Sequence, residues 1–66
     1  MKVIYDPAKD LMRIVFRDIP FEDYNEEQPN IKMHYDVDDQ LVAIEIQQAS
    51  ELIDDPRAVE HQILEI

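Results

Sequence analysis

The sequence predicts a mainly β fold, an antiparallel sheet of two β-hairpins with a short helical turn and a C-terminal strand or helix. Two observations predict this fold. Apolar and polar residues alternate over residues 31–46, and a shorter alternating pattern runs over residues 2–17. A period of two puts the apolar side chains on one face of a strand, whereas a helix needs a period of 3.6. At 66 residues the chain is one small domain, residues 1–66.

The N-terminal hairpin consists of strands at residues 2–5 and 11–17, joined by a turn over residues 6–10. Pro7 presets the backbone angle for the second position of a type I turn, and the Asp6 carboxylate can accept a bond from the turn's own backbone. The predicted register pairs Asp6 with Leu11, Tyr5 with Met12 and Val3 with Ile14. This register gives the hairpin an apolar ladder on one face.

Residues 18–30 are rich in acids, Asn and Pro, and we predict a loop there. Phe21 and Tyr24 are the exceptions, and we expect both rings to pack onto the edge of the sheet. Binding of a partner by these rings is the alternative.

The second hairpin spans residues 31–46 and turns at Val37-Asp38-Asp39-Gln40. The chain has no glycine, so any positive φ angle must fall to Asn or Asp, and a four-residue loop avoids two such angles. The predicted register pairs Val37 with Gln40, Tyr35 with Val42, Met33 with Ile44 and Ile31 with Ile46, and sets Lys32 opposite Glu45 on the other face. A slip of one residue would break both the apolar ladder and this charge pair.

Beyond the second hairpin, residues 48–53 are predicted to form a short helical turn, with Ser50 as a capping residue. The tail, residues 57–66, has two interpretations. Asp55 and Pro56 are a proper start for a helix, but Val59, His61 and Ile63 also alternate as in a strand. We favour a strand that extends the sheet or crosses to a second subunit.

The predicted core is the apolar face that the two hairpins share. Its members are Val3, Tyr5, Met12, Ile14, Phe16, Ile31, Met33, Tyr35, Val42, Ile44 and Ile46. A chain of this size buries little surface, and without cysteine it has neither a disulfide nor a thiolate metal site to stabilise it. We therefore expect a homodimer.

The chain carries a net charge of −10, and its acidic surplus lies in residues 21–66. Such a charge argues against direct binding of nucleic acid and suits a basic protein partner. No apolar run is long enough to span a bilayer and no secretory signal is recognisable, so we expect a cytoplasmic protein without membrane partners.

Two segments together resemble a known family. Residues 5–10 read Tyr-Asp-Pro-Ala-Lys-Asp, and residues 35–46 read Tyr-Asp-Val-Asp-Asp-Gln-Leu-Val-Ala-Ile-Glu-Ile. In this order and at this separation they resemble the small prokaryotic family known as domain of unknown function 2283, over roughly residues 1–50. The sequence departs from the family's pattern at His34, where an acid is usual, and at Gln40 and Ala43, where glycines are usual.

The resemblance implies no catalytic, cofactor-binding or metal-binding residues, because the family has no established activity. Some members are encoded beside small toxin-like proteins, and this implies an antitoxin-like role as one alternative. The departures at Gln40 and Ala43 imply a longer or less tight turn.

Few residues suggest chemistry. Asp36, Asp38 and Asp39 could bind a cation, but their spacing fails the EF-hand pattern and turn formation accounts for them. Ser50 with His61 lacks a recognisable catalytic arrangement, and the two histidines have no metal-ligand spacing. We therefore assign no catalytic residue, metal ligand or cofactor.

Four further side chains are assigned structural roles. His34 is predicted to lie at the surface, and Glu45 to pair with Lys32 across the strands. Arg13 and Arg17 share a strand face, and we expect them to pair with nearby acids rather than to bind an anion.

The function that these observations favour is a non-catalytic protein-interaction module. The alternatives are an antitoxin-like partner of a small basic toxin, and a minimal enzyme or metal-binding protein with its site at a dimer interface.

Overall fold

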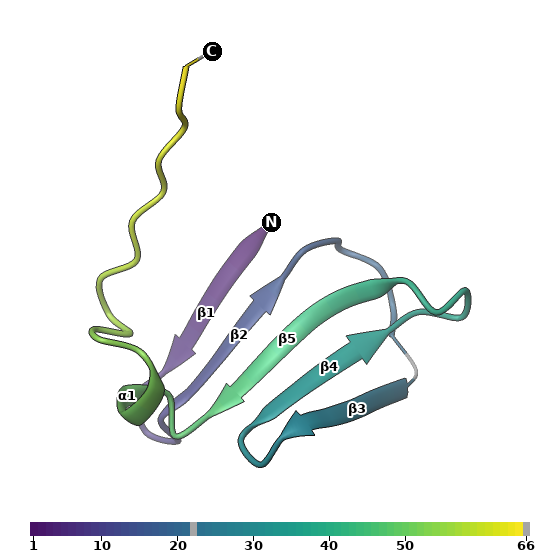
Figure 1. Cartoon of the computed structure of the whole chain (residues 1–66), viewed down its shortest axis with the longest axis horizontal. Coiled ribbons are helices and arrows are strands. Elements are labelled where there is room, and N and C mark those ends of the chain that lie inside the picture. Colours follow the sequence, from purple (N-terminus) through teal and green to yellow (C-terminus); the bar gives the residue numbers. More distant parts are fainter. Residues whose placement is uncertain (22, 66) are drawn as a thin grey trace.

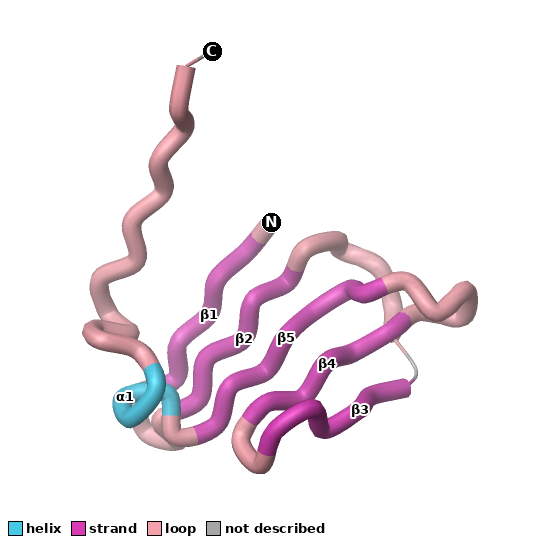
Figure 2. Tube along the Cα trace, in the orientation of Figure 1, coloured by secondary structure: helices cyan, strands magenta, loops and turns pink. Residues whose placement is uncertain are grey.

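The computed structural model describes residues 1–21 and 23–65, apart from the side chain of Glu27. It contains a single antiparallel sheet with the strand order β1-β2-β5-β4-β3 and a short helix, α1 (Figures 1 and 2). The elements are β1 (Lys2–Asp6), β2 (Leu11–Val15), β3 (Asp23–Gln28), β4 (Ile31–Tyr35), β5 (Leu41–Gln47) and α1 (Ala49–Leu52). Because β5 pairs with both β2 and β4, the two predicted hairpins join into one sheet.

The N-terminal hairpin has the predicted register. Asp6 pairs with Leu11, Tyr5 with Met12 and Val3 with Ile14. The Asp6 carboxylate accepts a bond of 3.0 Å from the Ala8 amide, as predicted for a side chain that stabilises its own turn. The turn ends at Asp10, whose φ of 50° is the left-handed conformation that glycine would otherwise supply.

The β4–β5 hairpin has the predicted register over most of its length. Ile31 pairs with Ile46, Lys32 with Glu45 and Met33 with Ile44. The prediction is wrong near the turn, where a bulge makes Tyr35 pair with Leu41 instead of Val42. The carbonyl of Val42 accepts a bond of 2.7 Å from the Phe16 amide, so this residue extends the pairing with β2.

The loop of this hairpin closes at Asp36 and Gln40, not at Val37 and Gln40 as predicted. The Asp36 amide donates to the Gln40 carbonyl at 3.0 Å, and the Asp39 amide donates to the Asp36 carbonyl at 3.1 Å. Asp39 adopts a φ of 60°. In this chain without glycine, aspartate therefore takes the left-handed position here, as predicted. The prediction that only Asn or Asp would do so is wrong at Gln48, whose φ is 52°.

β3 is a correction to the predicted loop over residues 18–30. Its sequence, Asp-Tyr-Asn-Glu-Glu-Gln, has no apolar alternation, so no periodic signal marked it as a strand. It pairs along β4, with an irregularity between Glu26 and Gln28. As an edge strand it needs only one paired side, and charged residues are suited to such an edge because they discourage further pairing.

The C-terminal prediction is right for the helix and wrong for the tail. α1 lies within the predicted span of 48–53, but residues 57–65 form neither a strand nor a helix. Asp55 starts a turn instead of a helix: its carboxylate accepts a bond of 3.1 Å from the Arg57 amide, and its carbonyl one of 3.0 Å from the Ala58 amide. The tail then runs beside β1 and past the end of the sheet (Figure 1).

The strand registers place the predicted core residues of β1, β2, β4 and β5 on one face of the sheet, but this face is only partly buried. Met12 and Val42 are buried, together with Ala43 and Ala49, which the prediction omitted. The other predicted core residues are half-buried, except Phe16, whose 37% exposure makes its assignment to the core wrong. The reason is the architecture: the molecule is one sheet thick, with a shortest extent of 18 Å.

Candidate functional site

The main candidate surface is one side of the sheet, which we call the apolar face. Strand pairing aligns two rows of side chains across β1, β2, β5 and β4. The rows are Val3, Ile14, Ile44 and Met33, and Tyr5, Met12, Ile46 and Ile31. None of these eight side chains is charged, although a third of the chain's residues are.

No second layer covers the middle of the apolar face in the part of the chain that the structure describes. Figure 1 shows the strands side by side, with α1 at one end of the sheet and the tail beside β1. Seven of the eight residues of the apolar face are half-buried, and Met12 is the buried one. Because stable domains bury such a face against another element, the apolar face is an incomplete core.

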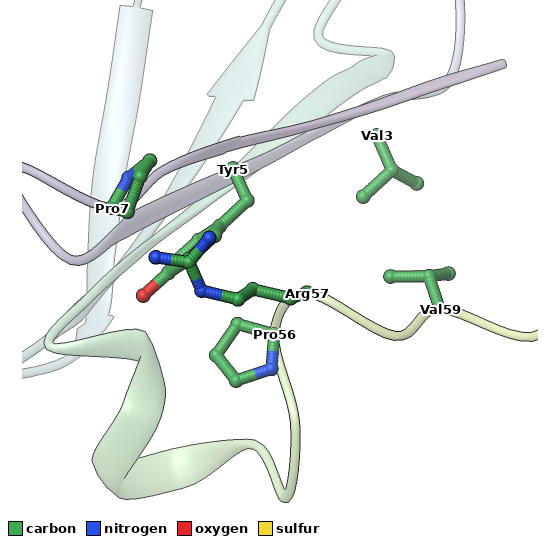
Figure 3. A pocket seen from close by; sticks show the side chains of 6 residues that line it. All are labelled: Val3, Tyr5, Pro7, Pro56, Arg57 and Val59. Carbon is green, nitrogen blue, oxygen red and sulfur yellow. The ribbon is translucent and has the colours of Figure 1, made fainter.

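A groove of about 440 Å³ lies between β1 and the start of the tail (Figure 3). Its walls are formed by Val3, Tyr5, Pro7, Pro56, Arg57 and Val59. The Arg57 guanidinium lies 6.0 Å from the centre of the Tyr5 ring, at the limit of a cation–π contact. The groove continues the apolar face at its β1 margin, since Val3 and Tyr5 belong to both.

Asp10 links the first turn to α1. Its carboxylate accepts bonds from the Tyr5 hydroxyl at 2.7 Å, the Ser50 amide at 3.0 Å and the Ser50 hydroxyl at 2.6 Å. Its backbone carbonyl accepts a bond of 2.9 Å from the Ala49 amide. Asp10 therefore caps the helix. The prediction that Ser50 caps it is wrong: Gln48 holds the N-cap position and makes no side-chain cap, and the Ser50 hydroxyl donates to Asp10.

These bonds shift two pKa values in opposite directions. The Ser50 hydroxyl bond, followed by the Tyr5 hydroxyl bond, lowers the pKa of Asp10 below its ordinary 3.8. The bond to the Asp10 carboxylate raises the pKa of Tyr5 above its ordinary 10.0. Both shifts favour an ionised aspartate with a protonated tyrosine, which is the state that forms the bond.

Ser50 and His61 are not brought together. Ser50 bonds to Asp10 at the β1–β2 turn, whereas His61 lines a second hollow with Met1 and Val3 near the start of β1. The Ser50 hydroxyl is thus engaged by the carboxylate of the capping residue, Asp10.

The opposite face of the sheet carries a polar cluster around Glu45. Its carboxylate contacts the Arg13 guanidinium and the His34 ring, both at 3.3 Å. The predicted Lys32–Glu45 pair is therefore wrong: the two residues are opposite in register, but the Lys32 ammonium lies 5.0 Å from the centre of the Tyr24 ring. Arg13 does pair with a nearby acid, as predicted.

His34 is more enclosed than predicted. Its side chain is 12% exposed, and the Phe21 and Tyr24 ring centres lie 4.7 Å and 5.9 Å from its own. The Phe21 ring does pack onto the sheet, as expected. Tyr24 instead belongs to the edge strand β3, opposite His34, and is 55% exposed. Phe21 belongs to the connection from β2 to β3, so this connection passes His34 on the face opposite to the apolar face.

The comparison with known families gives one match. Residues 2–50 match the family described as protein of unknown function (DUF2283). The chain belongs to this family. No curated protein and no solved structure matches the chain. The DUF2283 match includes the whole sheet and ends at Ser50, so the tail lies outside it.

Within the DUF2283 match, Asp36 organises the β4–β5 loop. Its Oδ1 atom accepts bonds of 2.9 Å from the amides of Asp38 and Gln40, and its Oδ2 atom lies 3.0 Å from the Arg17 guanidinium. The Gln40 bond, then the Asp38 bond and Arg17, lower the pKa of Asp36. The predicted pairing of Arg17 with an acid is confirmed.

The candidate cation ligands do not form a shared site. Asp36 is engaged by the loop, and the side chains of Asp38 and Asp39 are exposed. Among residues 1–21 and 23–65, no three His, Cys, Asp or Glu side chains are grouped so that they could hold a metal ion. In the same residues, no helix is long and apolar enough to cross a membrane.

Sequence reasoning missed the role of Asp10 because its partner lies 40 residues away. One signal was present: Asp10 ends the Tyr-Asp-Pro-x-x-Asp motif of the family. Nothing in the sequence predicted the groove beside β1, because its position depends on where the tail leaves α1.

Proposed function

We propose that this DUF2283 chain is a non-catalytic interaction module that acts as a homodimer, with the apolar faces of two copies toward each other. The observation that supports it most directly is the apolar face itself, eight uncharged side chains on a sheet without a second layer. A second sheet supplies that layer and completes a sandwich core.

The charge distribution limits where two copies can meet. Two chains of net charge −10 repel each other, so a contact between them is least opposed where the facing surfaces carry no charge. The apolar face meets this condition, whereas the opposite face presents Arg13, Lys32 and Glu45. Dimerisation also adds the buried area that a 66-residue chain lacks.

Adjacent residues of β2 provide a matched test. Ile14 lies on the apolar face and Val15 on the opposite face, and both are half-buried. We expect the unmodified chain to sediment as a dimer at tens of micromolar. Ile14→Glu should weaken association at least about tenfold, which is ~1.4 kcal/mol, because it brings like charges into the contact, whereas Val15→Glu should leave association unchanged.

Circular dichroism would establish that both variants keep the sheet before their masses are compared. A monomeric mass for the unmodified chain at tens of micromolar would refute the proposal. Equal weakening by the two variants would also refute it, since the apolar face would then have no special role.

A second candidate is a basic protein partner, which the exposed acids of β3 support. Asp23 and Glu26 lie on this edge strand and are exposed. An antitoxin-like role is the narrower form of this candidate. Salt-sensitive binding of a lysine-rich peptide that Asp23→Asn with Glu26→Gln abolishes would favour it, and no binding at low salt would remove its support.

A further inference from the structure

The last part of the tail, residues 59–65, is an extended apolar segment, which we call the arm. Val59, Ile63 and Leu64 are 56%, 79% and 77% exposed. No residue of the arm belongs to a helix or a strand, and the arm continues beyond the end of the sheet (Figures 1 and 2). Three large apolar side chains within seven residues are costly to leave in water, so the arm needs an apolar surface.

The chain just before the arm is attached to β1, on the same side of the sheet as the apolar face. Pro56 is buried, and the Arg57 guanidinium lies over the Tyr5 ring, which belongs to the apolar face. Val59 then faces Val3 across the groove (Figure 3). The direction of the arm is therefore set by its attachment to β1, and the C-terminal end of the tail lies beyond the sheet of its own chain (Figure 1).

We propose that the arm of each copy packs against the apolar face of its partner, beside the contact between the sheets, and buries Ile63 and Leu64 there. This inference rests on the proposed homodimer and names the segment that completes it. The arm lies outside the DUF2283 match, which ends at Ser50.

The area of the apolar face supports an additional contact. Four strands spaced ~4.8 Å apart and five residues long give a flat footprint of roughly 300 Å². Stable protein–protein contacts bury about 800 Å² of accessible surface on each partner. The flat footprint of the sheet is small beside that area, so an additional apolar segment would strengthen the contact.

The length of the arm also fits. Seven extended residues reach ~23 Å, and the four strands of the apolar face span only ~14 Å from first to last. The arm is thus long enough to carry Ile63 and Leu64 onto the part of the partner's apolar face that borders the contact between the sheets.

The first experiment measures the dimer dissociation constant by sedimentation equilibrium. Ile63→Asp with Leu64→Asp should raise this constant at least about tenfold, because two charges replace two buried side chains. The control is Gln62→Asp with Glu65→Gln, which alters the polar neighbours in the same segment. An unchanged constant for the first variant would overturn the proposal for the arm.

The second experiment exploits the absence of cysteine in the chain. One copy carries Leu64→Cys and a differently tagged copy carries Cys in place of one residue of the apolar face. The positions, one from each strand, are Val3, Ile14, Ile44 and Met33. We expect a mixed disulfide with at least one of them after mild oxidation, and none with Lys32→Cys on the opposite face.

The outcomes distinguish failure of the proposal for the arm from failure of the proposed homodimer. If Ile14→Glu weakens the dimer but no mixed disulfide forms, the proposal for the arm is refuted and the proposed function is retained. A chain that carries both cysteines and closes within itself, without mixed disulfides between copies, shows that the arm covers its own sheet, which also overturns the proposal. A monomeric chain removes both proposals.

Discussion

Two aspartates connect separate parts of the molecule at the scale of single residues. Asp10 joins the β1–β2 turn to α1, and Asp36 joins the β4–β5 loop to Arg17 beyond β2. Each carboxylate accepts at least three bonds from groups that donate best to an ionised acceptor. Both pKa values are therefore lowered, and the two carboxylates tie stability to pH.

The pH dependence of Asp10 has a definite sign. Because folding lowers the pKa of Asp10, its stabilisation is complete above the ordinary value of 3.8 and is lost as the pH falls through the lower folded value. Because folding raises the pKa of Tyr5, the contribution of that group is complete below 10.0 and is lost as the pH rises through the higher folded value.

We predict that Asp10→Asn lowers the urea midpoint at neutral pH and reduces the further loss on acidification to about pH 3. The amide cannot ionise, so this acid-dependent bond is absent at every pH. Asp54→Asn removes the same charge from an exposed position and should keep the acid sensitivity of the unmodified chain. If Asp10→Asn lost as much stability between the two pH values as the unmodified chain, Asp10 would not be the acid-sensitive group that we infer.

At the scale of the elements, left-handed residues mark the points where strands and turns end. Asp10, Asp39 and Gln48 have φ angles of 50°, 60° and 52°, each at the end of a strand or turn. The left-handed region costs an L-residue about 1–2 kcal/mol, less for Asp and Asn, and glycine avoids this cost. Within the described residues, conformational strain therefore lies at three element boundaries.

We predict that Asp39→Gly raises the free energy of unfolding by about 0.5–1 kcal/mol, because glycine adopts this φ without a Cβ clash. Asp38→Gly is the matched control. Asp38 is outside the left-handed region, so the same substitution there should lower stability by a similar amount through the added freedom of the unfolded chain. Urea unfolding measures both, and stabilisation by both or by neither would contradict the argument from φ.

The whole molecule is a sheet with two unlike faces. One carries the apolar face and the other the Arg13–Glu45–His34 cluster, and the acids give a net charge of −10. Association through the apolar face gains from burial and is opposed by long-range repulsion between like-charged copies. Salt weakens the repulsion, because it screens exposed charges over about 10 Å at 0.1 M.

We predict that raising sodium chloride from about 0.05 M to about 0.5 M tightens the homodimer severalfold, because screening reduces the repulsion. Sedimentation equilibrium at the two salt concentrations measures this change. Weaker association at high salt would indicate a contact held by ion pairs, contrary to the proposed apolar one. The affinity of the Ile14→Glu homodimer should rise more with salt than that of the unmodified chain, because the substitution adds a like-charge pair to the contact.

The amino-acid sequence by itself determined the two hairpins and their registers, except beside the β4–β5 turn. Alternation fixes which residues share a face, and a slip by one residue would turn Met33 and Ile44 to the polar side, so local pattern and pairing agree. Asp39 in the turn followed from the same kind of local reasoning, because a chain without glycine must use another residue there.

The tertiary structure alone decided how these parts join. The strand order that places β5 between β2 and β4, the polar strand β3, the cap of α1 by Asp10 and the course of the tail all depend on partners distant in sequence. β3 shows the physical reason most clearly: its pairing comes from the free edge of β4, a surface that exists only once the second hairpin has folded. The half-exposed apolar face has the same origin, since burial depends on how many layers the whole molecule forms and not on the pattern of any strand.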